Sequence, residues 1–196
     1  MISVPCILFA GGKSSRMGSN KALLPFGGYT SLAHYQYERL SRIFSNVYIS
    51  TKSSDLFDFH ANFILDSNTT DFAPTAGFVS SFQTLKEQSI FVLSVDSPFV
   101  DESIITKLLE NHLPHHDATI AKTHSGSHPM VGFYNSSLLS AFIQMQEHND
   151  HRLGKLLCVS KTLYVEFDNE ELFANLNHPH EYQEALSRYN NIKTIG

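Results

Sequence analysis

The sequence predicts an α/β fold, with one three-layer α/β/α domain whose central sheet is mostly parallel and carries an added antiparallel strand pair. The apolar spacing switches repeatedly between periods of about 2 and about 3.6 residues, which indicates alternating strands and helices. Residues 4–10 (VPCILFA) and 90–95 (IFVLSV) are nearly continuous apolar runs, as in strands buried on both faces of a parallel sheet. Because no repeat, linker or compositional break divides the 196 residues, we expect a single domain over 1–196.

The first half of the chain reads as strands that alternate with helices. The expected strands are residues 4–10, 46–50, 62–66 and 90–95. The helices are expected around Leu32, Gln36 and Leu40 with Thr30 or Ser31 as N-cap, around Phe78, Val79, Phe82 and Leu85, and around Ile104, Ile105, Leu108 and Leu109 after Asp101. Right-handed crossovers between parallel strands then place helices on both faces of the sheet.

The second half is less regular. Two strands at 117–123 and 129–135, joined by the turn-rich HSGSH, would form the antiparallel pair. The remaining expected elements are a helix from Ser136 to about Asn149, a strand at 163–167 and a terminal helix with Pro179 at its first position.

Composition limits the classes of function. The formal net charge is −5, with 14 basic against 19 acidic residues, so the chain lacks the basic footprint of a nucleic-acid binder. Cys6 and Cys158 lie in apolar segments without metal-site spacing, which predicts buried thiols in a reducing compartment. No signal-type segment and no apolar run near the roughly 18 residues of a membrane span occurs, so a cytoplasmic protein that does not enter the membrane is expected.

The stretch FAGGKSSRMGSNK, residues 9–21, follows the first strand directly. Gly11 and Gly12 would let the backbone amides approach a phosphate closely, and Lys13, Arg16 and Lys21 would neutralise its charge. Neither a P-loop nor a G-x-G-x-x-G fingerprint is present. The residues therefore predict phosphate binding at the carboxyl end of this strand, with a structural turn as the alternative.

This stretch resembles the signature of nucleotidyltransferases with a GT-A-like, Rossmann-related fold, the nucleotide-diphospho-sugar transferase-like architecture. Four further segments extend the resemblance to the MobA-type molybdenum cofactor guanylyltransferases. They are LDS with APTAGF (65–67 and 73–78), VDSPF (95–99), HP (128–129) and FANLNHPHE (173–181). The similarity thus runs from residue 4 to about 186.

The resemblance implies transfer of GMP from GTP to molybdopterin, or to its molybdenum form, with release of pyrophosphate. It implies Arg16, Lys21 and Asp96 as catalytic residues, with Mg²⁺ or Mn²⁺ on Asp96. The implied nucleotide-binding residues are Phe9, Ala10, Gly11, Gly12, Lys21, Ser50, Asp66, Gly77 and Asp96, with Asp66 accepting from the guanine. On the acceptor side it implies His128, Asn175 and Asn177. Cofactor-insertion proteins and molybdoenzyme chaperones are implied as transient partners.

Several alternatives stay open. Ser50 stands where the guanylyltransferases often carry Asn, and the missing amide leaves a molybdopterin cytidylyltransferase, or another small-acceptor nucleotidyltransferase of this fold, as an alternative. A non-catalytic nucleotide-binding adaptor is a second alternative. Individually, Asp96 could instead be a turn or N-cap residue, Asp66 a strand-end residue and His128 a structural histidine.

Overall fold

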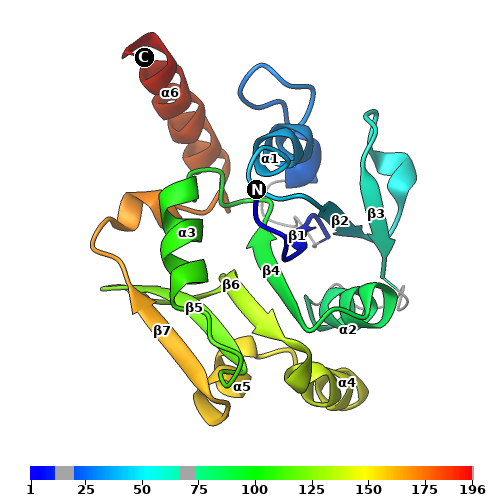
Figure 1. Cartoon of the computed structure of the whole chain (residues 1–196). Helices are drawn as coiled ribbons and strands as arrows, with labels where there is room; N and C mark the ends of the chain where they lie inside the picture. Colours follow the sequence, from blue (N-terminus) through cyan, green and yellow to red (C-terminus); the bar gives the residue numbers. More distant parts are fainter. Residues whose placement is uncertain (12–19, 67–73, 196) are drawn as a thin grey trace.

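A computed structural model describes residues 1–11, 20–66 and 74–195, with side chains through residue 191. Their centre is a seven-stranded sheet in the order β3-β2-β1-β4-β6-β5-β7 (Figure 1). The strands are β1 Cys6–Phe9, β2 Val47–Thr51, β3 Asn62–Leu65, β4 Ser89–Ser94, β5 Ala118–Thr123, β6 Gly126–Asn135 and β7 Thr162–Glu166. Each predicted strand has a counterpart, so the predicted α/β class is confirmed.

The strand directions match the prediction of a parallel sheet with an antiparallel addition. β1 pairs in parallel with β2 and β4, and β2 with β3. β6 runs antiparallel to β4 and β5, whereas β7 is parallel to β5. The hairpin between β5 and β6 is tighter than expected, because Gly126, at a φ of 139°, already pairs with Thr123. The strand predicted at 129–135 therefore starts at Gly126.

Six α-helices and four short 3₁₀ turns connect the strands among the described residues. The helices are α1 Leu32–Leu40, α2 Pro74–Leu85, α3 Glu102–Glu110, α4 Leu139–Glu147, α5 Leu153–Val159 and α6 Pro179–Ile195, and the turns are η1 Lys21–Leu23, η2 Ser54–Leu56, η3 Ser136–Leu138 and η4 Glu170–Phe173. Of the two N-cap candidates for α1, Ser31 is the cap, since its Oγ accepts from the backbone N–H of His34 at 3.1 Å. Asp101 caps α3 in the same way, as predicted.

The sheet carries a separate apolar core on each face. The side chains of β1 alternate, so Cys6 and Leu8 face the core shared with α1, α3 and α6, while Ile7 and Phe9 face the core shared with α2, α4 and α5. Figure 1 shows these two groups of helices on opposite sides of the sheet. This arrangement confirms the predicted three layers.

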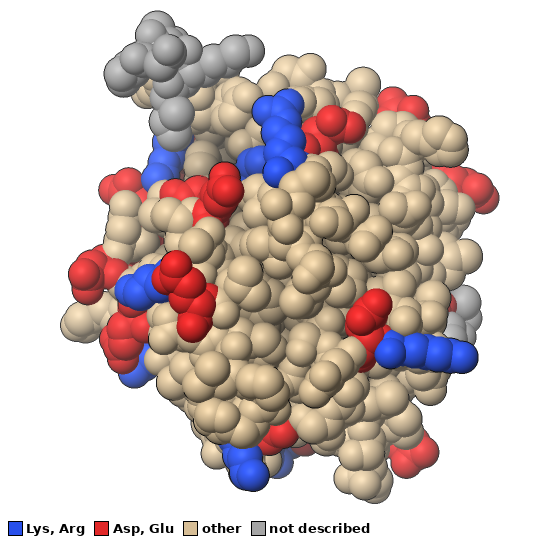
Figure 2. All heavy atoms as spheres, in the orientation of Figure 1, with Lys and Arg blue, Asp and Glu red and all other residues tan. Residues whose placement is uncertain are grey.

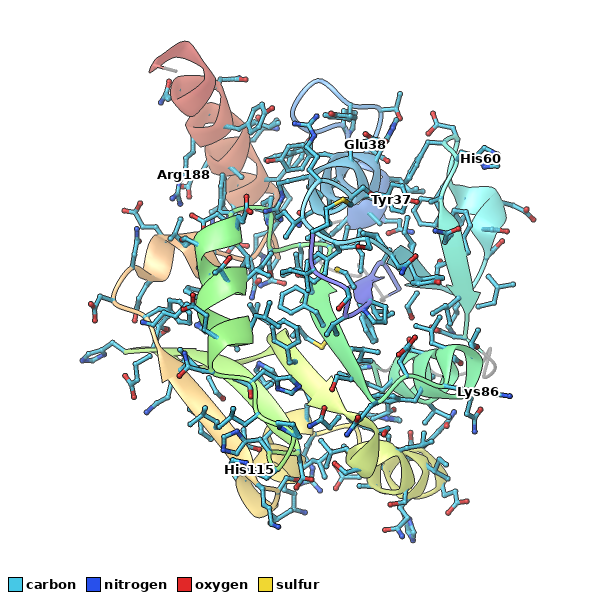
Figure 3. The ribbon with its side chains drawn as sticks, viewed as in Figure 1. Tyr37, Glu38, His60, Lys86, His115 and Arg188 are labelled. Carbon is cyan, nitrogen blue, oxygen red and sulfur yellow. The ribbon has the colours of Figure 1, made fainter. Side chains whose placement is uncertain are left out.

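Helix α6 is joined to the body of the molecule by aromatic and cationic contacts. The Tyr189 ring packs against Phe26 with ring centroids 5.4 Å apart. Arg188 of the same helix, labelled in Figure 3, places its guanidinium 4.3 Å from the centre of the Phe99 ring. Acidic and basic side chains are interspersed over the face shown in Figure 2. None of the helices in the described ranges is long and apolar enough to cross a bilayer.

The region after β6 departs from the prediction. The helix predicted from Ser136 begins as the 3₁₀ turn η3, and α5 was not predicted. The prediction that Cys158 is buried is wrong, because α5 buries only Leu153 and Leu157, four residues apart, and turns Cys158 to solvent. Cys6 is buried in β1 as predicted, and desolvation raises the pKa of its thiol well above the ordinary value.

We expect Gly132→Ala to destabilise the fold by about 1–3 kcal/mol through overpacking. Gly132 lies in β6 between two partner strands, and a Cβ there would lie 2.4 Å from the backbone oxygen of Thr119. The matched control is Gly154→Ala in α5, where a Cβ meets nothing within 4 Å and higher helix propensity should stabilise slightly. Urea denaturation of both variants measures the difference, and equal midpoints would contradict the prediction.

Candidate active site at the carboxyl edge of the sheet

The carboxyl ends of the parallel strands carry the predicted site residues. Beyond β1 and β3 the sheet-like hydrogen bonding continues, because Ala10 N–H donates to the Ser50 carbonyl at 3.0 Å and Asp66 N–H to the Thr51 carbonyl at 2.9 Å. Asp96 follows β4, the other parallel neighbour of β1. The backbone thus places Ala10, Asp66 and Asp96, three predicted nucleotide-binding residues, along one edge of the sheet. This is the edge where α/β folds commonly bind ligands.

Lys21, Asp96 and Asn177 meet at this edge, although they are far apart in the sequence. The Lys21 Nζ donates to Asp96 Oδ2 at 3.0 Å and to Asn177 Oδ1 at 2.9 Å. The side chains of Lys21 and Asp96 are only 17% and 19% exposed, so their ion pair is screened less than one on the open surface. The turn η1 positions Lys21 and is itself capped by Asn20, whose side chain accepts from Ala22 N–H.

Two serines complete the surroundings of Asp96. Ser94 donates its hydroxyl proton to Asp96 Oδ1 at 2.6 Å, so both carboxylate oxygens have a donor. Ser97 donates to Asn175 Oδ1 at 2.7 Å and thereby ties the C-terminal segment to the loop after β4. Neither serine was predicted as a site residue. Their positions two before and one after the predicted aspartate, in SVDS, are the signal that could have indicated them.

Glu181 holds the segment that carries the two asparagines. Its Oε2 accepts from the backbone N–H of Asn177 at 2.6 Å and of His178 at 2.8 Å, at the start of α6. This resembles the Glu half of a capping box. Partial desolvation raises the pKa of Glu181, but the two backbone hydrogen bonds, together with the charges of His178 and His180, outweigh it and the net pKa is lowered. Asn177 is therefore fixed toward Lys21 by a cap within its own segment.

Asp66 and Ser50 form a second polar pair at the edge. The Ser50 hydroxyl donates to Asp66 Oδ1 at 2.9 Å. Desolvation raises the pKa of Asp66, and the Ser50 hydrogen bond and the charge of Lys52 offset only part of this effect. Gly77, in the first turn of α2, lies against the pair: a Cβ there would lie 2.5 Å from Ser50 Oγ and 2.5 Å from a ring carbon of Phe9. The contact explains why this position holds glycine.

His128 makes contacts that also suit a structural residue. Its Nε2 lies 3.0 Å from the Thr123 hydroxyl, and its ring stacks on Phe173 with centroids 4.5 Å apart. Desolvation lowers the pKa of His128, which the charge of Glu170 only partly offsets. Its predicted acceptor role stays a prediction. Gly12 and Arg16 lie outside the described residues, as does Lys13.

The part of the chain that the structure describes contains no group of three or more His, Cys, Asp and Glu residues able to hold a metal ion. In the cluster of Lys21, Asp96 and Asn177, the carboxylate comes from Asp96, whereas Asp66 lies in the separate pair with Ser50. One carboxylate matches the protein share of a Mg²⁺ site completed by substrate phosphates and water. The residues present thus fit a metal shared with a bound nucleotide better than a metal held by the protein alone.

The comparisons with known proteins agree in family and fold. The family model described as the MobA-like NTP transferase domain matches residues 6–161. A molybdenum cofactor guanylyltransferase of Campylobacter jejuni is 40% identical over 93% of this chain and 95% of its own length. One of Helicobacter pylori is 34% identical over 94% of this chain and 92% of its own.

Among solved structures, the molybdopterin-guanine dinucleotide biosynthesis protein A of Archaeoglobus fulgidus superposes with a TM-score of 0.82 at 20% identity, covering 96% of this chain and 100% of its own. At this identity the likeness concerns the fold. The matching family model and the two relatives extend across the sheet edge that carries Lys21, Asp66 and Asp96. The chain therefore belongs to the family of MobA-like NTP transferase domains.

Proposed function

We propose that this protein is a molybdenum cofactor guanylyltransferase that transfers GMP from GTP to molybdopterin, or to its molybdenum form, and releases pyrophosphate. The observation that carries the proposal is the cluster of Lys21, Asp96 and Asn177 at the carboxyl edge of the sheet. The relatives at 34% and 40% identity are molybdenum cofactor guanylyltransferases, which supports the choice of guanine and of acceptor. A cytidylyltransferase is the second candidate, because Ser50 offers no amide to a base.

In the proposed reaction a terminal phosphate oxygen of molybdopterin attacks the α-phosphorus of GTP. A new phosphorus–oxygen bond forms while the bond to the bridging oxygen of the pyrophosphate breaks in line with it. The attacking phosphate is already anionic, so no side chain has to remove a proton from it. The protein then needs mainly to orient the two substrates and to neutralise the charge that develops on the leaving group.

Lys21 and Asp96 divide these tasks. Lys21, together with Arg16, supplies positive charge for phosphate oxygens. Asp96 would hold Mg²⁺, or Mn²⁺, in an orientation that the Ser94 hydroxyl helps to fix. When bound, such an ion polarises the α-phosphate and stabilises the departing pyrophosphate. Phe9, Ala10, Gly11, Gly12 and Gly77 would provide close backbone approach and the walls of the nucleotide site.

Recognition of the base and of the acceptor involves other residues. Asp66 would accept hydrogen bonds from N1–H and the 2-amino group of guanine. Asn175, Asn177 and His128 would lie on the acceptor side. We also propose that the enzyme works in the cytoplasm, where GTP is available, and passes its product to cofactor-insertion proteins or molybdoenzyme chaperones.

Thermal unfolding with GTP, CTP, ATP or UTP, each with Mg²⁺, tests the nucleotide. A ligand at 100 times its Kd stabilises a fold by about 2.7 kcal/mol, so we expect a clear upward shift in Tm with GTP. A shift with CTP alone would instead favour the cytidylyltransferase. The decisive assay incubates the protein with GTP, Mg²⁺ and molybdopterin, and the absence of any guanine dinucleotide would rule out the proposed reaction. GTP binding without turnover would identify the adaptor.

A further inference from the structure

Ser50, Phe9 and Gly77 form a close contact directly beside Asp66. Ser50 is 2% exposed, and its hydroxyl donates a hydrogen bond to Asp66 Oδ1. The backbone of Gly77 is so near that an added Cβ would overlap both Ser50 Oγ and the Phe9 ring. A larger side chain at position 50 therefore has no space unless Phe9 or α2 moves.

The Phe9 ring itself has little freedom to move. It is 6% exposed and packs against Phe78 of α2 with ring centroids 5.1 Å apart. A large side chain at position 9 is thus combined with a small one at position 50. A Cβ on Gly77 would lie 2.5 Å from both the Phe9 ring and Ser50 Oγ, so an amide at position 50 would have to share this tightly packed space with the ring.

The carboxylate of Asp66 is consequently presented in one orientation. Ser50 holds Oδ1, and Oδ2 lies on the side of Gly11, where an added Cβ would be 3.6 Å from it. Gly11 begins the glycine-containing segment that follows β1. Oδ2 is therefore the oxygen directed at a ligand held over Gly11.

On the basis of the proposed function, we propose that Ser50 is a positioning residue for guanine recognition, which orients Asp66 through its hydroxyl and does not contact the base. In this chain no amide at position 50 contacts the base. Instead, the packing of Phe9, Ser50 and Gly77 holds Asp66 in place, and Asp66 recognises the base. The nucleotide that this arrangement selects is one whose base has adjacent N–H donors facing a carboxylate, as guanine does.

The effect of the Ser50 hydroxyl on Asp66 can be measured without any nucleotide, through the ionisation of Asp66. Desolvation raises the pKa of Asp66, whereas the Ser50 hydrogen bond and Lys52, the charged group that acts on it within the described ranges, lower it. Because the folded pKa is raised, the native state holds the proton to higher pH than the unfolded chain does. Stability is then lost as the pH rises through the folded pKa, and removal of the Ser50 hydroxyl enlarges this loss.

The first test compares thermal unfolding of the wild type, Ser50→Ala, Asp66→Asn and the double variant at pH 5 and pH 8. Ser50→Ala is expected to lower Tm more at pH 8 than at pH 5, and this difference should vanish in the Asp66→Asn background. Ser45→Ala, at an exposed serine, is the matched control. An equal loss of Tm at both pH values would overturn the positioning role.

The second test measures GTP binding. Loss of a hydrogen bond to a charged group predicts a Kd about tenfold weaker for Ser50→Ala, with a KM that rises more than kcat changes. Ser50→Asn is expected to bind weakly by crowding Phe9, and Phe9→Leu/Ser50→Asn to recover part of the affinity. Wild-type affinity in Ser50→Ala, or in Ser50→Asn alone, would overturn the inference. If the wild type itself bound no GTP, the proposed function would fail, and so would the role of Ser50 in guanine recognition. The unfolding data would still show whether Ser50 positions Asp66.

Discussion

Asp96→Asn is expected to lower GMP transfer about a thousand-fold while the fold stays intact. The substitution removes a negative charge without changing the shape of the side chain. Loss of a metal-holding carboxylate takes away several kcal/mol of transition-state stabilisation, and about 4 kcal/mol corresponds to that factor. The amide oxygen can still accept from the ammonium of Lys21, and the amide NH₂ can donate to the hydroxyl oxygen of Ser94, so packing at the edge should persist.

Steady-state kinetics with increasing Mg²⁺ measure the effect, and circular dichroism checks the fold. We expect high Mg²⁺ to restore part of the activity, because the substrate phosphates contribute ligands of their own. The control is Asp150→Asn, since Asp150 also forms a close ion pair, with Arg152 at 2.6 Å, in the loop between α4 and α5. Wild-type turnover in Asp96→Asn would mean that the metal is held elsewhere.

The carboxyl edge of the sheet was predictable because each buried strand is followed directly by its functional residues. Two continuous apolar runs identified β1 and β4, and a parallel pair must present Gly11 and Asp96 at the same edge. The charge-neutralising role of Lys21 was predicted from the basic residues that follow β1, whereas its catalytic role and the role of Asn177 came from the family resemblance. Their contact across 156 positions of sequence is a property of the folded chain alone, and spacing could not reveal it.

The parts that the sequence did not predict depend on short elements and on tertiary contacts. Helix α5 spans only Leu153–Val159 and buries two residues, so its apolar period is too short to distinguish from a turn. The apolar run LLCV around Cys158 predicts burial of the whole run, yet α5 turns Cys158 to solvent and buries Leu157 instead. Ser94 and Ser97 acquire their roles only because Asp96 and Asn175 lie within hydrogen-bonding distance.

Lys21→Met is expected to reduce kcat/KM for GTP by about 100- to 1,000-fold, the usual effect of losing one group that stabilises developing negative charge. Methionine keeps the length of the apolar stem and lacks the ammonium, so the change tests the charged group. The same atom donates to Asp96 and to Asn177, so its removal also leaves the Asn177 side chain without this hydrogen bond, while Ser97 and the backbone N–H of Leu176 still hold the C-terminal segment at the edge. A rise in KM for the acceptor should accompany the loss.

Lys21→Arg separates charge from geometry. One compact ammonium reaches two acceptors at 2.9 and 3.0 Å, and a planar guanidinium cannot occupy the same point, so arginine should restore only part of the activity. The control is Lys122→Met, which breaks a pair with Glu166 at 2.8 Å whose side chains are 42% and 68% exposed. Such a surface pair is worth at most about 1 kcal/mol, and we expect normal turnover. If Lys21→Met were as active as this control, the positive charge at the α-phosphate would have to come from residues other than Lys21.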